Sequence, residues 1–215
     1  TLGADNGIGV AAQLAILAAN DIEHGDLECL FTVDEETGLT GAYALTKDFL
    51  SAKYLMNLDT EEEGEFYIGC AGGKGTKAFF RYKDDIPPTG YYWFKVQVKG
   101  LNGGHSGSEI DRGLGNANKI LNRYLWTLLK RTDLRISEID GGNLHNAIAR
   151  EAYAIAGVPV GDRDFAASSL NTLAADVESE LKTVDPNVKL LIETVDEPKY
   201  VIDKDTTFNL VNAIY

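Results

Sequence analysis

The stretch Tyr91–Gly100, YYWFKVQVKG, decides the fold of the second part of the chain. Its side chains alternate in character, and Tyr92, Phe94, Val96 and Val98 fall on one face of an extended backbone. Alternation over this length is typical of a β-strand that is buried on one side only. The stretch therefore predicts a strand whose even-numbered residues face a hydrophobic core.

The residues that follow this strand predict a regular series of further elements. In chain order we predict a helix over 115–131, strands over 134–140 and 150–159, a helix over 164–184 and a strand over 188–196. The order β-α-β-β-α-β is the split arrangement of ferredoxin-like domains. We therefore predict an α+β domain over residues 73–215, which begins in the glycine-rich segment 69–75.

Residues 1–72 show a different pattern. Apolar residues lie on most faces of the segment 6–20, which predicts a largely buried helix. Apolar runs over 27–33 and 53–58 predict strands, and the segment 40–50 between them predicts a helix. Strand, helix and strand in this order favour a parallel sheet covered by helices. The predicted class of this part is therefore α/β.

The overall composition narrows the possible partners and surroundings. Among 215 residues, 33 acidic side chains outnumber 20 Lys and Arg, and the resulting net charge of −13 argues against nucleic-acid binding. No apolar run approaches the length of a membrane span, and no signal peptide opens the chain. The two cysteines, Cys29 and Cys70, are expected to be reduced core thiols of a cytoplasmic protein. The chain begins at Thr1 and stops within an apolar periodic segment, so we expect it to be a piece of a longer protein.

Carboxylates lie at corresponding places in the first part of the chain. Asp5 precedes the first predicted helix, Glu35 and Glu36 follow one predicted strand, and Asp59 follows the next. The carboxyl ends of parallel strands lie along one edge of a sheet, where such folds bind ligands. Four converging carboxylates would destabilise the fold unless cations lay between them. The pattern therefore indicates a site for two divalent metal ions.

Such a site would carry out hydrolysis. Two bridged metal ions turn a bound water into hydroxide near neutral pH, and a carboxylate that is not a ligand can take its proton. The neighbours Glu35 and Glu36 could divide these roles, one as base and one as ligand. The alternative is that these acids are solvated turns or helix N-caps, and each cluster taken alone favours that interpretation. Only the joint placement of three clusters favours the metal site.

Several segments together resemble a known family. They are GADNGIG (3–9), DEETG (34–38), NLDTEEEGEFYIGCAGG (57–73), GGHSG (103–107) and GLGNAN (113–118). In these motifs the chain resembles the di-zinc peptidase family that includes carnosinases, and within it the aminoacyl-histidine (Xaa-His) dipeptidases. The resemblance implies a parallel-sheet catalytic domain over residues 1–72 and a lid domain over 73–215. It implies hydrolysis of Xaa-His dipeptides by a metal-bridging hydroxide and a Glu general base.

The resemblance also implies roles for individual residues of the first part. Asp5 would be the bridging ligand, Glu36 a ligand of one metal ion and Asp59 a ligand of the other. Glu35 would be the general base. The cofactor would be two divalent metal ions, zinc in the first place, with cobalt or manganese as alternatives because carboxylate and imidazole ligands accept several metals.

In the second part, the resemblance points to substrate-binding residues. His105 in GGHSG would be the lid histidine that stabilises the oxyanion. Asn146 and Arg150 in HNAIAR would bind the carboxylate end of the substrate, although Ala149 stands where the family usually has Pro. The implied partners are a small dipeptide and a second copy of the chain, bound through the lid domain.

The family's histidine ligands have no counterparts in this chain. Its His-x-Asp motif would precede GADN, and its last histidine ligand would follow Tyr215. Imidazole ligands normally complete a zinc shell. We therefore expect the chain by itself to bind zinc weakly and to be inactive.

Two other functions stay open at the level of sequence. The segment GIGVAA (7–12) fits the dinucleotide pattern G-x-G-x-x-A, and Asp34 could then bind a ribose in a nucleotide-binding oxidoreductase. The glycines lack a recognisable preceding strand, and Asp34 lies rather far from them. Alternatively, the β-α-β-β-α-β part could be a non-catalytic interaction module whose sheet edge pairs with another chain.

Overall fold

The structure is a computed structural model that describes residues 4–60, 62–70, 72 and 74–215, without the side chains of Ala4 and Asp5. The chain divides into two compact units, unit 1 (Thr1–Lys74) and unit 2 (Gly75–Tyr215). The division follows Lys74, whereas the sequence places the boundary after residue 72. Each unit is described by itself below.

Unit 2 is an antiparallel sheet with helices on one face. Its main elements are β2 (Tyr91–Lys99), α4 (Ala117–Arg131), β4 (Arg135–Gly141), β6 (Ala152–Pro159), α5 (Arg163–Leu181) and β7 (Lys189–Thr194). The strand order is β4-β6-β2-β7, and every neighbouring pair is antiparallel. The β-α-β-β-α-β order predicted from the sequence is confirmed, and each of the six elements lies close to its predicted range.

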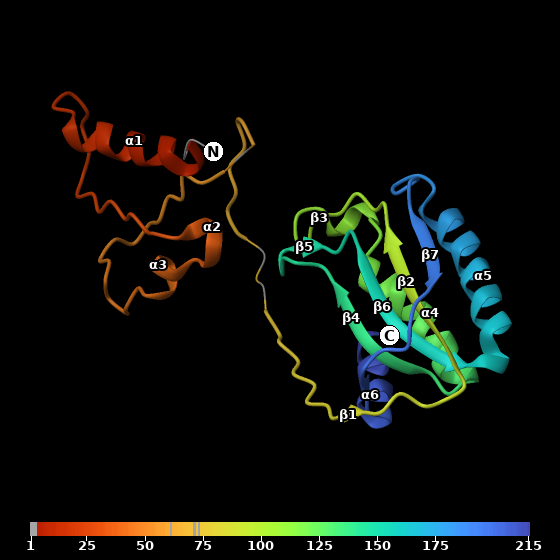
Figure 1. Ribbon diagram of the computed structural model, residues 1–215. Helices are drawn as coiled ribbons and strands as arrows, with labels where there is room; N and C mark the ends of the chain where they lie inside the picture. Colours follow the sequence, from red (N-terminus) through yellow and green to blue (C-terminus); the bar gives the residue numbers. More distant parts are fainter. Residues whose placement is uncertain (1–3, 61, 71, 73) are drawn as a thin grey trace. The chain divides into compact units, whose positions relative to one another are not determined.

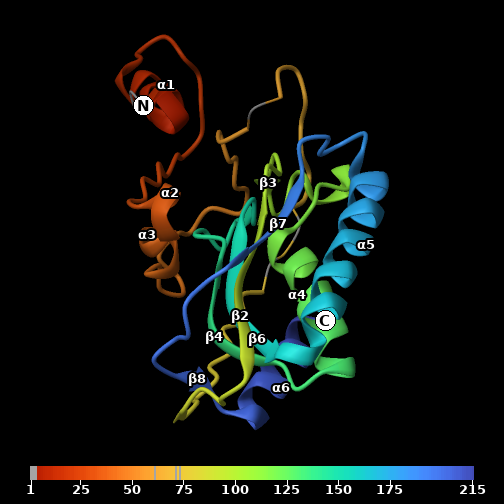
Figure 2. The ribbon, with the colours of Figure 1, turned by 45° about the vertical axis from the view of Figure 1, so that its right-hand side comes forward.

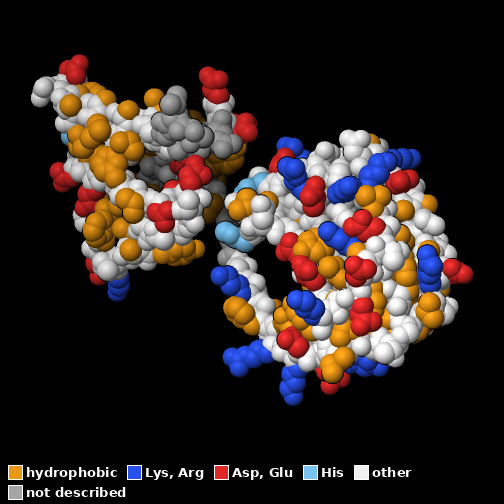
Figure 3. Space-filling model, in the orientation of Figure 1, with side chains coloured by type: hydrophobic (Ala, Val, Ile, Leu, Met, Phe, Trp, Pro, Cys, Tyr) orange, Lys and Arg blue, Asp and Glu red, His pale blue; other side chains and the backbone are white. Residues whose placement is uncertain are grey.

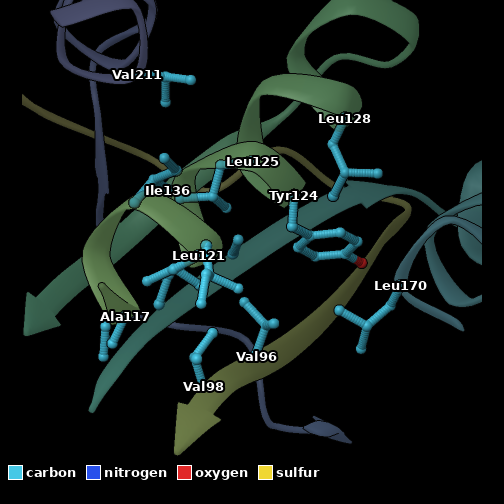
Figure 4. Close-up of a cluster of buried hydrophobic side chains, with 14 of the residues drawn as sticks. Val96, Val98, Ala117, Leu121, Tyr124, Leu125, Leu128, Ile136, Leu170 and Val211 are labelled. Atoms are coloured by element: carbon cyan, nitrogen blue, oxygen red, sulfur yellow. The ribbon is translucent and has the colours of Figure 1, made fainter. Parts of the chain in front are cut away.

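The core of unit 2 lies between the sheet and its two main helices. Phe94, Val96 and Val98 on β2 are at most 1% exposed, as the alternation predicts. Tyr92 is only half-buried, and Trp93 on the opposite face is buried as well, so this part of the prediction is wrong. Figure 2 shows α4 and α5 packed on the same face of the sheet. In Figure 4, Tyr124 and Leu121 of α4 lie between the helix and β2. Full burial of an aliphatic side chain contributes about 1.5–3 kcal/mol, so this layer supplies much of the stability of the unit.

Smaller elements complete unit 2. They are β1 (Asp84–Asp85), β3 (Gly104–His105), β5 (Ala147–Ile148), β8 (Val201–Ile202), α6 (Lys204–Ile214) and two 3-10 turns, η1 (Ile110–Arg112) and η2 (Val160–Asp162). β1 pairs with β8, and β3 pairs with β5, in two short antiparallel ribbons. α6 is joined to α4 by a buried hydrogen bond, in which Asn122 Nδ2 donates to the Val211 carbonyl at 2.9 Å. The β3–β5 ribbon is the one that matters for the site.

Unit 1 contains short helices and irregular chain. Its described elements are α1 (Ala4–Ala18), α2 (Glu35–Gly38) and α3 (Thr40–Tyr43) (Figure 1). The strands predicted over 27–33 and 53–58 are not formed, and α3 ends well before residue 50, where the predicted helix ends. A parallel strand forms by hydrogen-bonding to a neighbouring strand in a sheet whose faces are covered, and the described part of unit 1 contains no strand. Val33, Tyr54 and Met56 are accordingly exposed.

The first helix differs from its prediction in burial. α1 forms as the periodicity predicts, but Ile8, Leu14 and Leu17 are each more than half exposed. Hydrophobic side chains are visible over much of the displayed face of unit 1 (Figure 3). A helix that is apolar on most faces is buried only where other layers cover it. The described residues of unit 1 supply no such cover for these side chains.

Two further features concern the cysteines and the membrane. Cys29 and Cys70 are free thiols, and Cys70 is exposed. The prediction that both are core thiols is therefore wrong, because Cys29 is only half-buried and Cys70 lies at the surface. Within the described residues, no helix combines the length and the apolar character that a membrane crossing requires.

Removing side-chain volume from the core of unit 2 should destabilise it strongly. Leu125 is fully buried, so Leu125→Ala is expected to lower the free energy of unfolding by about 2–5 kcal/mol. Urea unfolding followed by tryptophan fluorescence measures this unit selectively, because the only two tryptophans of the chain, Trp93 and Trp126, both belong to it. Val160→Ala, at an exposed position, should stay within about 0.5 kcal/mol of wild type. Equal effects of the two substitutions would contradict the packing described here.

Candidate functional site

His105 lies on a long loop between β2 and α4, at the end of the sheet. In the β3–β5 ribbon, His105 is paired with Ala147 and Gly104 with Ile148. The next amide, Ser106 N–H, donates to the Asn146 carbonyl at 2.8 Å. The ribbon therefore brings His105 next to the segment that contains Asn146 and leads to Arg150, three residues that the sequence predicted as parts of one site.

Two backbone amides fix the imidazole ring of His105. Gly107 N–H and Ser108 N–H both donate to His105 Nδ1, at 3.0 and 3.1 Å. An amide N–H can only donate, so Nδ1 must accept, and the neutral ring carries its proton on Nε2. His105 is exposed. The turn thus presents an imidazole N–H donor, which is the group needed to stabilise a developing oxyanion.

A carboxylate next to this turn was missed by the sequence analysis. Glu109 Oε2 accepts the His105 backbone N–H at 2.7 Å, and Glu109 Oε1 forms an ion pair with Arg112 at 2.6 Å. Glu109 therefore holds the backbone of the catalytic candidate, while the ring is held by its own turn. The glycines around His105 indicate a tight turn, but nothing in the sequence identifies the acidic residue that accepts the His105 backbone N–H.

Arg150 lies across the loop that carries His105. A Cβ added at Gly103 would lie 2.3 Å from Arg150 Cγ, so the arginine stem passes over this residue at a distance that only glycine permits. Gly103 also has a φ of 69°, which favours glycine. Arg150 is exposed, and it forms no ion pair with any residue that the structure describes. Its guanidinium is thus available to an anion.

Arg150 also lines a cleft at the end of the sheet. The cleft has a volume of about 650 Å³ and is bordered by β2, β4, β5 and the start of β6. Asp140 and Tyr153 lie on its wall. The Tyr153 hydroxyl donates to Glu138, and this hydrogen bond to a carboxylate raises the pKa of Tyr153. The cleft therefore offers a cation, a carboxylate and a neutral hydroxyl to a small polar ligand.

In unit 1, Asp34 organises the turn that carries the adjacent glutamates. Asp34 has a φ of 62°, a left-handed conformation that aspartate tolerates better than most residues. Its carboxylate accepts the hydroxyl of Thr37 and that of Thr40, the latter at 2.7 Å. Glu35 and Glu36 follow in the first turn of α2 and are exposed. Asp34 is thus a structural residue of this turn.

Of the three predicted metal ligands, the structure describes the side chains of two. Glu36 lies on α2, Asp59 lies in irregular chain, and the side chain of Asp5 is outside the described part of the structure. Among the described residues, no group of three or more His, Cys, Asp or Glu side chains could hold a metal ion. Those residues therefore do not by themselves fit a two-metal site.

The structure argues against the nucleotide-binding alternative. In a dinucleotide fold the glycines lie in the turn before a helix, where free amides bind the pyrophosphate. Here Gly7 and Gly9 lie inside α1, which already begins at Ala4. The Gly9 amide donates to Asn6 Oδ1 at 2.9 Å, and both carboxylate oxygens of Asp34 accept hydroxyls of their own turn. Neither proposed contact with a nucleotide is therefore supported.

Comparison with known proteins identifies the class of unit 2. Residues 89–186 match the family model described as the peptidase dimerisation domain. This range contains β2, β4 and β6 of the four-stranded sheet, α4, α5 and the loop of His105, whereas β7 follows it. Unit 2 thus contains a segment that is similar to peptidase dimerisation domains.

Similarity to individual proteins extends over almost all of the chain. It is 44% identical to the cytosol non-specific dipeptidase of Escherichia coli (strain K12) over 99% of this chain and 44% of that protein. It matches the crystal structure of the aminoacylhistidine dipeptidase from Vibrio alginolyticus with a TM-score of 0.79 and 37% identity, over 100% of this chain and 44% of that one. The chain is thus similar to these two dipeptidases over almost all of its own length. It spans less than half the length of the relatives it matches.

The tautomer of His105 can be measured directly. We expect the neutral ring to carry its proton on Nε2, because Nδ1 accepts two amide protons. Long-range ¹H–¹⁵N correlation spectra of the labelled 215-residue chain distinguish the two ring nitrogens. His24 and His145, the other two histidines, provide internal comparisons. A neutral His105 ring protonated on Nδ1 would contradict the geometry of the turn.

Proposed function

We propose that the whole protein of which this chain forms part is a metal-dependent dipeptidase. The observation that carries the proposal is the His105 turn, which presents an imidazole N–H donor on the same loop whose Gly103 lies against the stem of the exposed Arg150. A peptidase needs a donor for the carbonyl oxygen of the scissile bond and a cation for the substrate's carboxylate. The names of the similar proteins support this reaction.

The proposed roles of individual residues in catalysis and metal binding are the following. Glu35 would take the proton from the attacking water and pass it to the leaving amine. His105 Nε2–H would stabilise the oxyanion. We propose Asp5, Glu36 and Asp59 as ligands of the divalent metal ions, two in number, with zinc first and cobalt or manganese as alternatives.

The proposed substrate is a short peptide with a free carboxyl end. The Arg150 guanidinium can bind a carboxylate through two parallel hydrogen bonds, and Asn146 belongs to the same segment. One relative is named as non-specific and another as acting on aminoacyl-histidine. We propose Xaa-His dipeptides as the preferred substrates within a wider range of dipeptides. We also propose a cytoplasmic location, because the first relative is named as a cytosol dipeptidase.

Replacement of the proposed base should abolish activity and preserve metal binding. Glu35→Gln in the full-length protein is expected to lower kcat by at least about 10²-fold, because the proton of the attacking water loses its acceptor. The measurement is hydrolysis of β-alanyl-histidine and a panel of dipeptides, with the metal content determined on the same samples. Glu63→Gln, at another exposed position of unit 1, is the matched control and should keep full activity.

The metal content of Glu35→Gln shows which of the two glutamates is the base and which is the metal ligand. Loss of metal with Glu35→Gln would mean that Glu35 is a ligand and that the roles of Glu35 and Glu36 are reversed. A wild-type protein that cleaves no dipeptide with any divalent metal would overturn the proposed function.

We further propose that unit 2 mediates a homodimer. It matches a domain described as serving peptidase dimerisation, and β7 is an edge strand of the sheet. Leu191 on β7 is 40% exposed. An edge strand with unpaired backbone groups and exposed apolar side chains is a ready surface for pairing with a second copy.

A charge on this edge should weaken the dimer. Leu191→Glu is expected to shift the dissociation constant by about tenfold or more, because two like charges would be buried at a symmetric interface. Analytical ultracentrifugation of the 215-residue chain at several concentrations measures this. Val160→Glu, at an exposed apolar position outside β7, should leave association unchanged. A monomeric wild-type chain at all concentrations would contradict the proposal.

A further inference from the structure

One buried carboxylate holds both ends of the loop that carries His105. Asp185 Oδ1 accepts the Asn102 backbone N–H at 2.6 Å, and Asp185 Oδ2 accepts the Gly115 backbone N–H at 2.7 Å. The side chain of Asp185 lies between α5 and β7 and has no exposed surface. The loop over residues 100–116 is thus tied at its beginning and its end to the same side chain.

The turn that carries Asp185 is itself fixed. The Asp185 N–H donates to the Leu181 carbonyl at 2.8 Å, and the Val188 N–H donates to the Asp185 carbonyl at 3.1 Å. Asn102 adds a second link to this turn, because its Nδ2 donates to the Val184 carbonyl at 2.6 Å. The α5–β7 turn and the start of the His105 loop are therefore joined through both backbone and side chain.

Two glycines allow this close approach. A Cβ at Gly100 would lie 2.2 Å from the Asn187 carbonyl oxygen, and Gly100 has a φ of 82°. A Cβ at Gly115 would lie 2.7 Å from side-chain carbons of both Leu101 and Leu181. The approach at Gly100 is thus possible only without a side chain, and a side chain at Gly115 would displace the ends of two leucines.

We propose that Asp185 is a positioning residue for His105 and that it acts through the loop without touching the ring. This proposal deepens the proposed function and rests on it for its catalytic part. Hydrogen bonds from backbone amides to a buried carboxylate are strong, and leaving one of those amides without its acceptor is costly. Between Asn102 and Gly115, the loop is held by the β3–β5 ribbon and by Glu109. The two hydrogen bonds to Asp185 therefore fix the position of the segment from which β3 and His105 project.

The test compares Asp185→Asn with a matched control in the same unit. Tyr124→Phe removes another buried hydrogen bond, from the Tyr124 hydroxyl to the Ala166 carbonyl at 3.0 Å, between α4 and α5. In the full-length protein, Asp185→Asn should lower kcat by about 10²-fold and change KM by less than about threefold, because misplacement of a catalytic group acts on the transition state. Tyr124→Phe should leave kcat within about twofold of wild type.

A second readout does not depend on catalysis. In the 215-residue chain, Asp185→Asn should accelerate hydrogen exchange at the Gly107 and Ser108 amides by about tenfold or more, because these amides are ordered only while the loop keeps its position. Tyr124→Phe should not accelerate them relative to the rest of the unit. If the wild-type protein cleaves no dipeptide, the proposed function fails, and the exchange rates still decide the role of Asp185.

A milder variant keeps the test decisive if Asp185→Asn does not fold. Asn102→Ala removes only the side-chain link to Val184 at an exposed position. It should change kcat and amide exchange in the same directions by about threefold or more. Unchanged exchange at Gly107 and Ser108 together with wild-type kcat, in whichever of the two variants folds, would overturn the proposal.

Discussion

The packing of one face of β2 against α4 is the contact on which the rest of unit 2 depends. β2 is hydrogen-bonded to β6 on one side and to β7 on the other, so its register determines theirs. A slip by one residue would turn Phe94, Val96 and Val98 away from the helices. The hydrophobic face therefore fixes where each strand ends, and the loops of the candidate site begin at those ends.

The loops at the end of the sheet are held by acceptors for backbone amides. A segment that leaves a sheet must satisfy its N–H groups in another way. Here the acceptors are His105 Nδ1, Glu109 and Asp185, and each holds two donor groups. The site histidine is thus both a candidate catalytic group and a structural part of its own turn, which is why its tautomer is determined by the fold.

The two parts of the chain differ in how much the sequence could predict. The strands and helices of unit 2 pack mainly against one another. The apolar periodicity of each segment therefore predicts side chains that are in fact buried within this unit. The two-residue strands β1, β3, β5 and β8 have no periodicity to detect. In unit 1, the runs over 27–33 and 53–58 have the composition of parallel strands, but such strands depend on distant partners, and the described residues provide none.

The same dependence governs what could be predicted of the site. The His105 motif and the HNAIAR segment can each be recognised within a few residues of sequence. Asp185, in contrast, lies 83 residues from Asn102 and 70 from Gly115. From the sequence alone, an acidic residue in a turn is usually predicted to be exposed to solvent. Apart from the family resemblance, Glu36 and Asp59 were predicted to converge because two parallel strands would end at one edge. Without those strands, Glu36 and Asp59 have no common strand edge in the described part of unit 1. The sequence argument for a shared site therefore depends on two strands that the described residues of unit 1 do not form.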